Sequence, residues 1–61
     1  MEFNLKIKMD NAAFSDYPAS EVTRILHTLV NDLESGRLSI EDKINLRDFN
    51  GNLVGVCEVE N

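Results

Sequence analysis

The chain has one cysteine, Cys57, one histidine, His27, and no tryptophan. A single cysteine excludes a disulfide within the chain, and the two residues together cannot form the Cys and His cluster of a structural zinc site. A lone thiol is also typical of a reducing compartment. A domain of 61 residues buries only about 60% of its unfolded surface. Without disulfides, metal or cofactor, we expect self-association as a homodimer to add stability.

Long apolar runs and positive charge are also scarce. No stretch approaches the roughly 20 apolar residues that cross a bilayer, and residues 1–4 do not resemble the start of a signal peptide. We therefore expect a soluble protein of the cytoplasm. Six basic against eleven acidic side chains give a net charge of −5. This balance disfavours broad contact with nucleic-acid phosphates and favours a partner protein with a basic surface.

One segment, residues 18–34, is long and periodic enough to predict a helix. Its apolar residues recur at the i, i+3, i+4, i+7 spacing of one helical face; they are Val22, Ile25, Leu26, Leu29 and Leu33, with Ala19 and Val30 at the edge of the stripe. Pro18 suits a first helical turn, Asp16 or Tyr17 would be the cap, and Gly36 suits the end. We expect the whole stripe to face the core.

Three segments predict strands. Residues 2–9 alternate and should bury one face, made of Phe3, Leu5, Ile7 and Met9. Residues 44–47 should turn Ile44 and Leu46 inward. The Asn50-Gly51 pair then predicts a type I′ hairpin turn into residues 53–60. There Val54 and Cys57 cannot share a face under a strict period of two, so we expect a bulge at Gly55-Val56.

These elements predict a single α+β domain spanning residues 1–61. The order is β-α-β-β, with a three-stranded antiparallel sheet in spatial order 1-3-2 and the helix packed on one face. The loop at 37–42 should tuck Leu38 and Ile40 against the helix end. The other sheet face has no second layer in this chain, and we expect it to bind a partner or a second copy. The residues expected for self-association on this open face are Lys6, Lys8, Arg47 and Val56.

No residue set in the sequence forms a catalytic or metal motif. His27 should lie on the outer side of the helix without a nucleophile at triad spacing, and Cys57 should be a core residue rather than a nucleophile. Asp48, Asn50 and Asn52 resemble the start of a calcium loop, but the glycine comes fourth instead of sixth. We therefore expect a protein that is not an enzyme and has no metal or cofactor.

Carboxylates gather around the helix end and the loop that follows it. A charge cluster of this kind is usually solvated, but it can also mimic phosphate charge and bind a basic partner protein; the residues expected to do so are Asp32, Glu34, Glu41 and Asp42. The alternative is a nucleic-acid-binding regulator that uses Lys6, Lys8 and Arg47 on the open sheet face. Single-strand readers stack bases on exposed aromatics, whereas Tyr17 and Phe49 are expected in turns away from that strip.

Three stretches of the chain resemble a group of small proteins of unknown function scattered through phage and prophage genomes. They are Met9-Asp10-Asn11-x-Ala13-Phe14, Glu21-Val22-x-Arg24-Ile25-Leu26 and Leu46-Arg47-Asp48-x-Asn50-Gly51-Asn52-x-Val54-Gly55. The likeness spans most of the chain, but it consists of a turn, a helix face and a hairpin and brings no catalytic residues. The chain departs from the group in a longer connection between helix and hairpin and in Cys57, where a larger apolar residue is usual.

The resemblance implies a phage accessory protein that acts in the host cytoplasm. Small acidic phage proteins of this kind look like inhibitors of host defence, including anti-CRISPR proteins that occupy the surface of a nucleic-acid-guided effector. By this analogy, the chain would bind a host protein complex and inhibit or modulate it.

Overall fold

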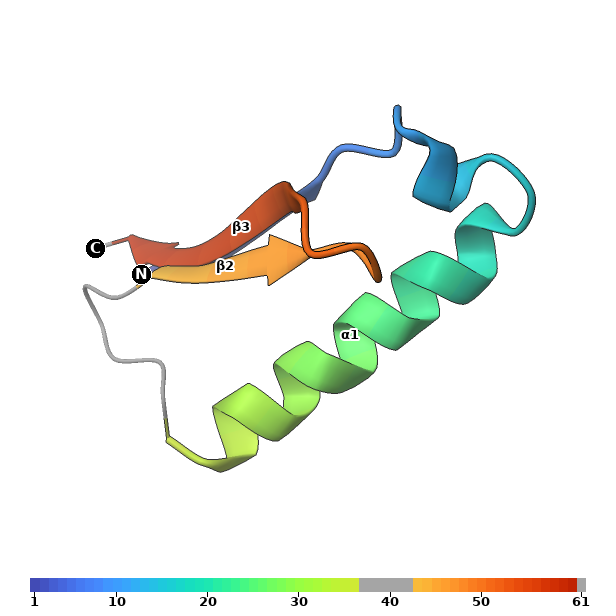
Figure 1. Cartoon of the computed structure of the whole chain (residues 1–61). Coiled ribbons are helices and arrows are strands. Elements are labelled where there is room, and N and C mark those ends of the chain that lie inside the picture. Colours follow the sequence, from blue (N-terminus) through green and yellow to red (C-terminus); the bar gives the residue numbers. More distant parts are fainter. Residues whose placement is uncertain (37–42, 61) are drawn as a thin grey trace.

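The structure, a computed structural model, describes residues 1–36 and 43–60. The elements in chain order are the strand β1 (Glu2–Ile7), the short 3₁₀ helix η1 (Ala12–Phe14), the helix α1 (Pro18–Glu34), and the strands β2 (Lys43–Arg47) and β3 (Leu53–Glu60). Both strand pairs are antiparallel, in the order β1-β3-β2. The helix lies on one face of this sheet (Figure 1). The predicted α+β fold and strand order are therefore confirmed.

The helix has the bounds that its sequence signals predict. Tyr17 is the N-cap residue and makes no side-chain capping bond, while Pro18 occupies the first turn. At the other end Ser35 donates its backbone N–H to the Asn31 carbonyl at 3.1 Å, and Gly36 follows with φ of 80°. Positive φ is the conformation in which glycine ends many helices, because it has no Cβ to clash.

Only part of the apolar stripe on α1 is buried. Ile25 and Leu29 are in the core and Val22 packs partly against it. The prediction that the whole stripe faces the core is wrong for the residues further round the helix, which are exposed: Ala19, Leu26, Val30 and Leu33. The physical reason is that one helix packs against β2 and η1 and leaves one of its flanks uncovered.

The uncovered flank lies toward β1. Arg24, on the opposite flank, donates from Nη2 to the Arg47 carbonyl oxygen at the end of β2. Leu26 follows two residues later and therefore lies about 200° further round the helix. β2 and β1 are the two edges of the sheet, so the flank with Leu26 overhangs the β1 side.

Strand β1 is correspondingly less buried than its alternation predicts. Phe3 is 50% exposed, Leu5 and Met9 are also exposed, and only Ile7 is partly buried. The strand ends at Ile7, two residues before the predicted end at Met9. Leu5 is directly opposite the fully buried Cys57, so its side chain lies on the helix side of the sheet. The apolar face of β1 thus points to the helix side of the sheet, as predicted, but α1 does not cover it fully.

The irregularity predicted in the third strand is present, close to its expected place. The pairing of β2 with β3 shifts by one residue between Leu46 and Arg47, so that Leu46 pairs with Gly55 and Arg47 with Leu53. The extra residue is Val54, not one at Gly55-Val56. As a result Val54 and Cys57, three residues apart, belong to the same buried cluster, which a regular strand would not allow.

The hairpin turn differs from the predicted type I′. Such a turn needs φ > 0 at both central residues, but within the described residues Gly51 is the member of the Asn50-Gly51 pair with positive φ, at 86°. The Gly51 N–H donates to the Asp48 carbonyl at 3.0 Å, and the Asp48 N–H donates to the Asn52 carbonyl at 3.0 Å. This is a type I turn followed by a left-handed glycine, the three-residue hairpin loop. Leu38 and Ile40 lie outside the described residues.

Candidate functional site

The Asp48 carboxylate holds the hairpin loop in place by accepting hydrogen bonds from its N–H groups. Asp48 is buried, and its Oδ1 accepts the backbone N–H groups of Asn50 and Asn52, each at 2.9 Å. Its Oδ2 accepts the side-chain amide of Asn11 at 2.8 Å and that of Asn52 at 3.2 Å. Asn50 and Asn52, which resembled calcium ligands in the sequence, therefore donate N–H groups to the Asp48 carboxylate. The bond from Asn11 joins the hairpin to the start of η1.

A second buried carboxylate, Glu21, joins the hairpin to the helix. Arg24 binds it through two nitrogens, with Nε to Oε1 at 2.8 Å and Nη2 to Oε2 at 3.1 Å. The backbone N–H of Phe49 donates to Oε2 at 2.8 Å. Sequence periodicity does not find this residue, because a charged side chain beside the apolar stripe is expected in solvent, and only the hairpin brings the Phe49 N–H to it.

Folding lowers the pKa of both carboxylates, Glu21 and Asp48. The hydrogen bond from Arg24 outweighs burial and, with that from the Phe49 N–H, lowers the pKa of Glu21. Burial would raise the pKa of Asp48, but the hydrogen bonds from Asn52, Asn11 and Asn50 together outweigh it and lower that pKa. A lowered folded pKa gives stability that is present above the unfolded pKa and lost as the pH falls.

We expect this linkage to appear as acid sensitivity that depends on Asp48. The free energy of unfolding of the wild type should fall as the pH drops from about 5 through the ordinary aspartate pKa of about 3.9. Asp48→Asn should be less stable than the wild type at pH 7 and should lose less further stability between pH 5 and 3. Urea unfolding at both pH values measures this. The control Asp10→Asn, at an exposed position, should keep the wild-type slope; an equal slope in Asp48→Asn would contradict the assignment.

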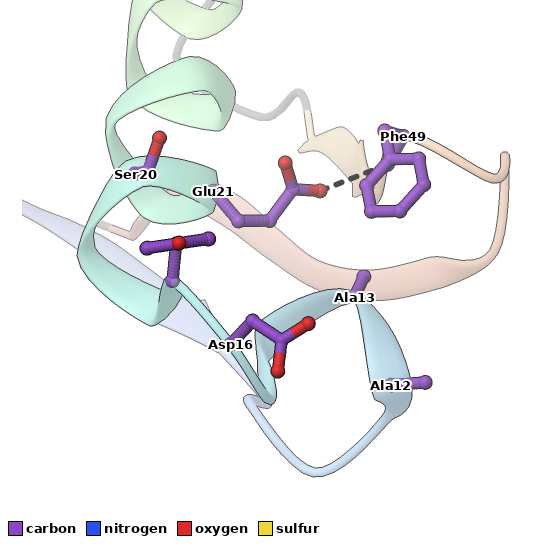
Figure 2. A pocket seen from close by; sticks show the side chains of 7 residues that line it. Ala12, Ala13, Asp16, Ser20, Glu21 and Phe49 are labelled. Atoms are coloured by element: carbon purple, nitrogen blue, oxygen red, sulfur yellow. Dashed lines mark hydrogen bonds between the residues drawn. The ribbon is translucent and has the colours of Figure 1, made fainter.

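These bonds shape a hollow between the start of α1, η1 and the hairpin, with a volume of about 250 Å³. In Figure 2 a dashed line marks the hydrogen bond between Glu21 and Phe49, and Asp16 is another of the side chains that line the hollow. Its lining is Ala12, Ala13, Asp16, Tyr17, Ser20, Glu21 and Phe49. We call it the Tyr17–Phe49 hollow, because its two aromatic side chains are largely exposed, Tyr17 at 77% and Phe49 at 63%.

The acidic groups of this hollow differ in their surroundings. Glu21 is held by Arg24 and the Phe49 N–H, so it is not positioned as a free general base. Across residues 1–36 and 43–60, no three His, Cys, Asp or Glu side chains are arranged to hold a metal ion. Asp16 is instead exposed, and an exposed carboxylate beside exposed aromatic rings attracts a cationic side chain through the ring faces and the negative charge together.

The acidic set predicted for partner binding is only partly described. Asp32 is partly buried and Glu34 exposed at the end of α1, about 200° apart around the helix, so the helix does not present them on one face. Glu41 and Asp42 lie outside the described residues. The sequence predicts Tyr17 and Phe49 in two separate turns. In the structure they line one hollow, because the hydrogen bond from the Phe49 N–H to Glu21 holds the hairpin beside the start of α1.

The open sheet face holds a second hollow, with a volume of about 450 Å³. Lys6, Lys8 and Val56 all line it, as the prediction of a shared open face requires. Arg47 is not among its lining residues; its Nη1 donates to the Gly51 carbonyl oxygen at 3.1 Å instead. The open face therefore combines two lysines with apolar surface from Leu53 and Val56.

The two residues considered for catalysis lie where the sequence predicts. His27 is exposed on α1. Cys57 is fully buried, and burial raises the pKa of its thiol, which disfavours the thiolate that nucleophilic chemistry needs.

Comparison with known protein families, with curated proteins and with solved structures found no significant match. Within the described residues, no helix is long and apolar enough to cross a membrane.

Proposed function

We propose that the chain is a small, non-enzymatic interaction protein that binds a partner protein with a basic surface and inhibits or modulates it. The observation that carries this proposal is the Tyr17–Phe49 hollow, in which two exposed aromatic side chains and the exposed carboxylate of Asp16 line one concave surface. Tyrosine and other large aromatics are enriched in the energetic centres of protein interfaces. A lysine or arginine of the partner would contact the two rings and the Asp16 carboxylate.

The rigidity of the site supports this role. Glu21 and Asp48 connect three segments that are distant in sequence, through the pairs Glu21–Phe49 and Asn11–Asp48. A hollow held in this way loses little conformational freedom when a partner binds, which leaves more of the contact energy for affinity. The net charge of −5 adds long-range attraction to a basic surface.

The resemblance to phage and prophage proteins gives the proposal a concrete form. The chain would act in the host cytoplasm as an anti-defence protein, of the kind represented by anti-CRISPR proteins, by occupying the surface of a host complex. The basic, nucleic-acid-binding surface of such a complex is the type of partner that the hollow and the acidic charge would suit.

Affinity capture tests the proposal. The tagged chain should capture one host complex from a nuclease-treated lysate, and Tyr17→Ala/Phe49→Ala should weaken binding to the purified complex by more than tenfold, because buried aromatic anchors often contribute about 2 kcal/mol or more each. The matched control is Leu53→Ala, an exposed apolar residue on β3, which should bind normally. Unchanged binding of the double variant would exclude the hollow as the contact.

The acidic set is tested in the same assay by replacing Asp32, Glu34, Glu41 and Asp42 with Ser. If this variant keeps its fold and its affinity, phosphate mimicry by these residues is excluded. The other candidate function, a nucleic-acid-binding regulator, is favoured by Lys6 and Lys8 lining one hollow of the open face. Recovery of nucleic acid alone, lost in Lys6→Glu/Lys8→Glu and at high salt, would replace the first proposal with this one.

A further inference from the structure

We propose that two copies of this chain associate through the free edge of β1, joining their sheets into one six-stranded antiparallel sheet. The inference concerns an edge of the molecule that the Tyr17–Phe49 hollow does not include, and it does not depend on the proposed function. It also differs from self-association through the open sheet face, because here the contact is formed by backbone groups of β1 and by the uncovered flank of α1.

The free edge of β1 presents backbone groups to which no strand in residues 1–36 and 43–60 is paired. Among these residues, β1 pairs with β3 alone. The Lys8 N–H donates to the Val54 carbonyl oxygen at 2.7 Å, and backbone groups alternate sides along a strand. The residues two, four and six positions earlier therefore also direct their groups to β3. Phe3, Leu5 and Ile7 direct theirs to the open edge, where a second strand can pair with them.

The charges on β1 are self-complementary in an antiparallel pairing centred on Asn4. This register keeps the apolar residues together, with Phe3 of one copy opposite Leu5 of the other. It places Glu2 of each copy directly opposite Lys6 of the other, at the closely spaced type of pair. Glu2 also lies beside Glu60 of its own chain, a repulsive neighbour. A lysine from the second copy would offset that repulsion.

The apolar surface beside this edge supplies the burial that the pairing requires. Phe3 and Leu5 are exposed on the helix side of the sheet, below the flank of α1 that overhangs β1. That flank carries three exposed apolar side chains, Leu26, Val30 and Leu33. A two-fold axis through the joined β1 strands places the flanks of both helices on the same face, toward one another. The interface is isologous, as most homodimer contacts are.

The other edge of the sheet is not suited to the same pairing. On β2 the register centred on Asn45 places Lys43 opposite Arg47 of the second copy, and like charges at opposed positions repel. The Arg47 carbonyl oxygen already accepts Arg24 Nη2 at 2.9 Å. The two edges thus differ in charge pattern, and only the β1 edge favours a second copy.

Sedimentation equilibrium of the untagged chain over a concentration series tests the proposal through charge exchange. Glu2→Lys and Lys6→Glu should each weaken the dimer about tenfold, because the dimer holds two symmetric pairs that each become repulsive. The double variant Glu2→Lys/Lys6→Glu should restore the wild-type dissociation constant. Both positions are exposed, so the monomer should keep its fold, which circular dichroism verifies.

A second pair of variants tests the helix flank. Val30→Lys should weaken the dimer by more than tenfold, whereas Asn31→Lys, the same change at the next residue on another side of α1, should not. A wild type that is monomeric up to about 1 mM would overturn the proposal. So would a dimer that the charge exchanges leave unchanged, or one that Val56→Ser on the open face breaks while Val30→Lys does not.

Discussion

Gly55→Ala should abolish most of the stability of this protein. Gly55 lies on β3 opposite Ile7, where the backbone of β1 passes so close that an added Cβ would overlap the Lys6 carbonyl oxygen and come within 3.0 Å of the Ile7 Cα. Both atoms belong to a paired strand and cannot move without breaking the ladder. Overpacking of this kind costs on the order of 3 kcal/mol, and domains of this size rarely have more than about 3–5 kcal/mol in total.

The same substitution at Gly51 is the matched control for a steric cause. Gly51 has φ of 86° and no atom within 4 Å of an added Cβ, so Gly51→Ala adds only backbone strain, about 1 kcal/mol. Thermal and urea unfolding of the two variants should therefore rank Gly55→Ala well below Gly51→Ala. Equal losses would mean that the close approach of β1 does not determine the need for glycine at position 55.

Ile25→Ala should have the second-largest effect, and its neighbour Leu26→Ala a small one. Both residues belong to the apolar stripe of α1, but Ile25 is 2% exposed in the core and Leu26 is 36% exposed on the flank. Truncating a buried isoleucine leaves a cavity and costs about 2–5 kcal/mol. Truncating a residue on an uncovered surface usually costs less than about 1 kcal/mol.

Urea unfolding at a concentration where the chain is monomeric measures this difference. Alanine favours the helix at both positions, so loss of helix propensity does not separate the variants. A large loss in Leu26→Ala under these conditions would contradict the exposed flank and, with it, the surface that the proposed dimer buries.

The sequence predicted those parts of the fold that local signals define. Pro18 and Gly36 mark the ends of α1 because each restricts or permits backbone angles whatever lies around it. The alternation of residues 53–60, and its break between Val54 and Cys57, predicted both the bounds of β3 and its irregularity. The 1-3-2 order followed from the handedness of the crossover connection.

What the sequence did not predict depends on contacts between segments. Glu21 is buried because the hairpin brings the Phe49 N–H to it, and the turn departs from type I′ where the Asp48 side chain receives the loop N–H groups. Leu26 and Phe3 match the apolar pattern as well as Ile25 does, yet they are exposed because α1 packs mainly against η1 and β2 in the described part of the chain. The Tyr17–Phe49 hollow was missed because its lining comes from three segments that only the fold brings together.

The pairing of Glu2 with Glu60 has a practical consequence for how the protein is handled. It brings the two ends of the described chain side by side, at the end of the sheet away from η1 and the hairpin loop (Figure 1). An affinity tag or fused domain at either end therefore leaves the Tyr17–Phe49 hollow accessible for capture. The same tag lies next to Glu2, where it can block the free edge of β1, so a tagged sample can bind a partner normally while underreporting self-association.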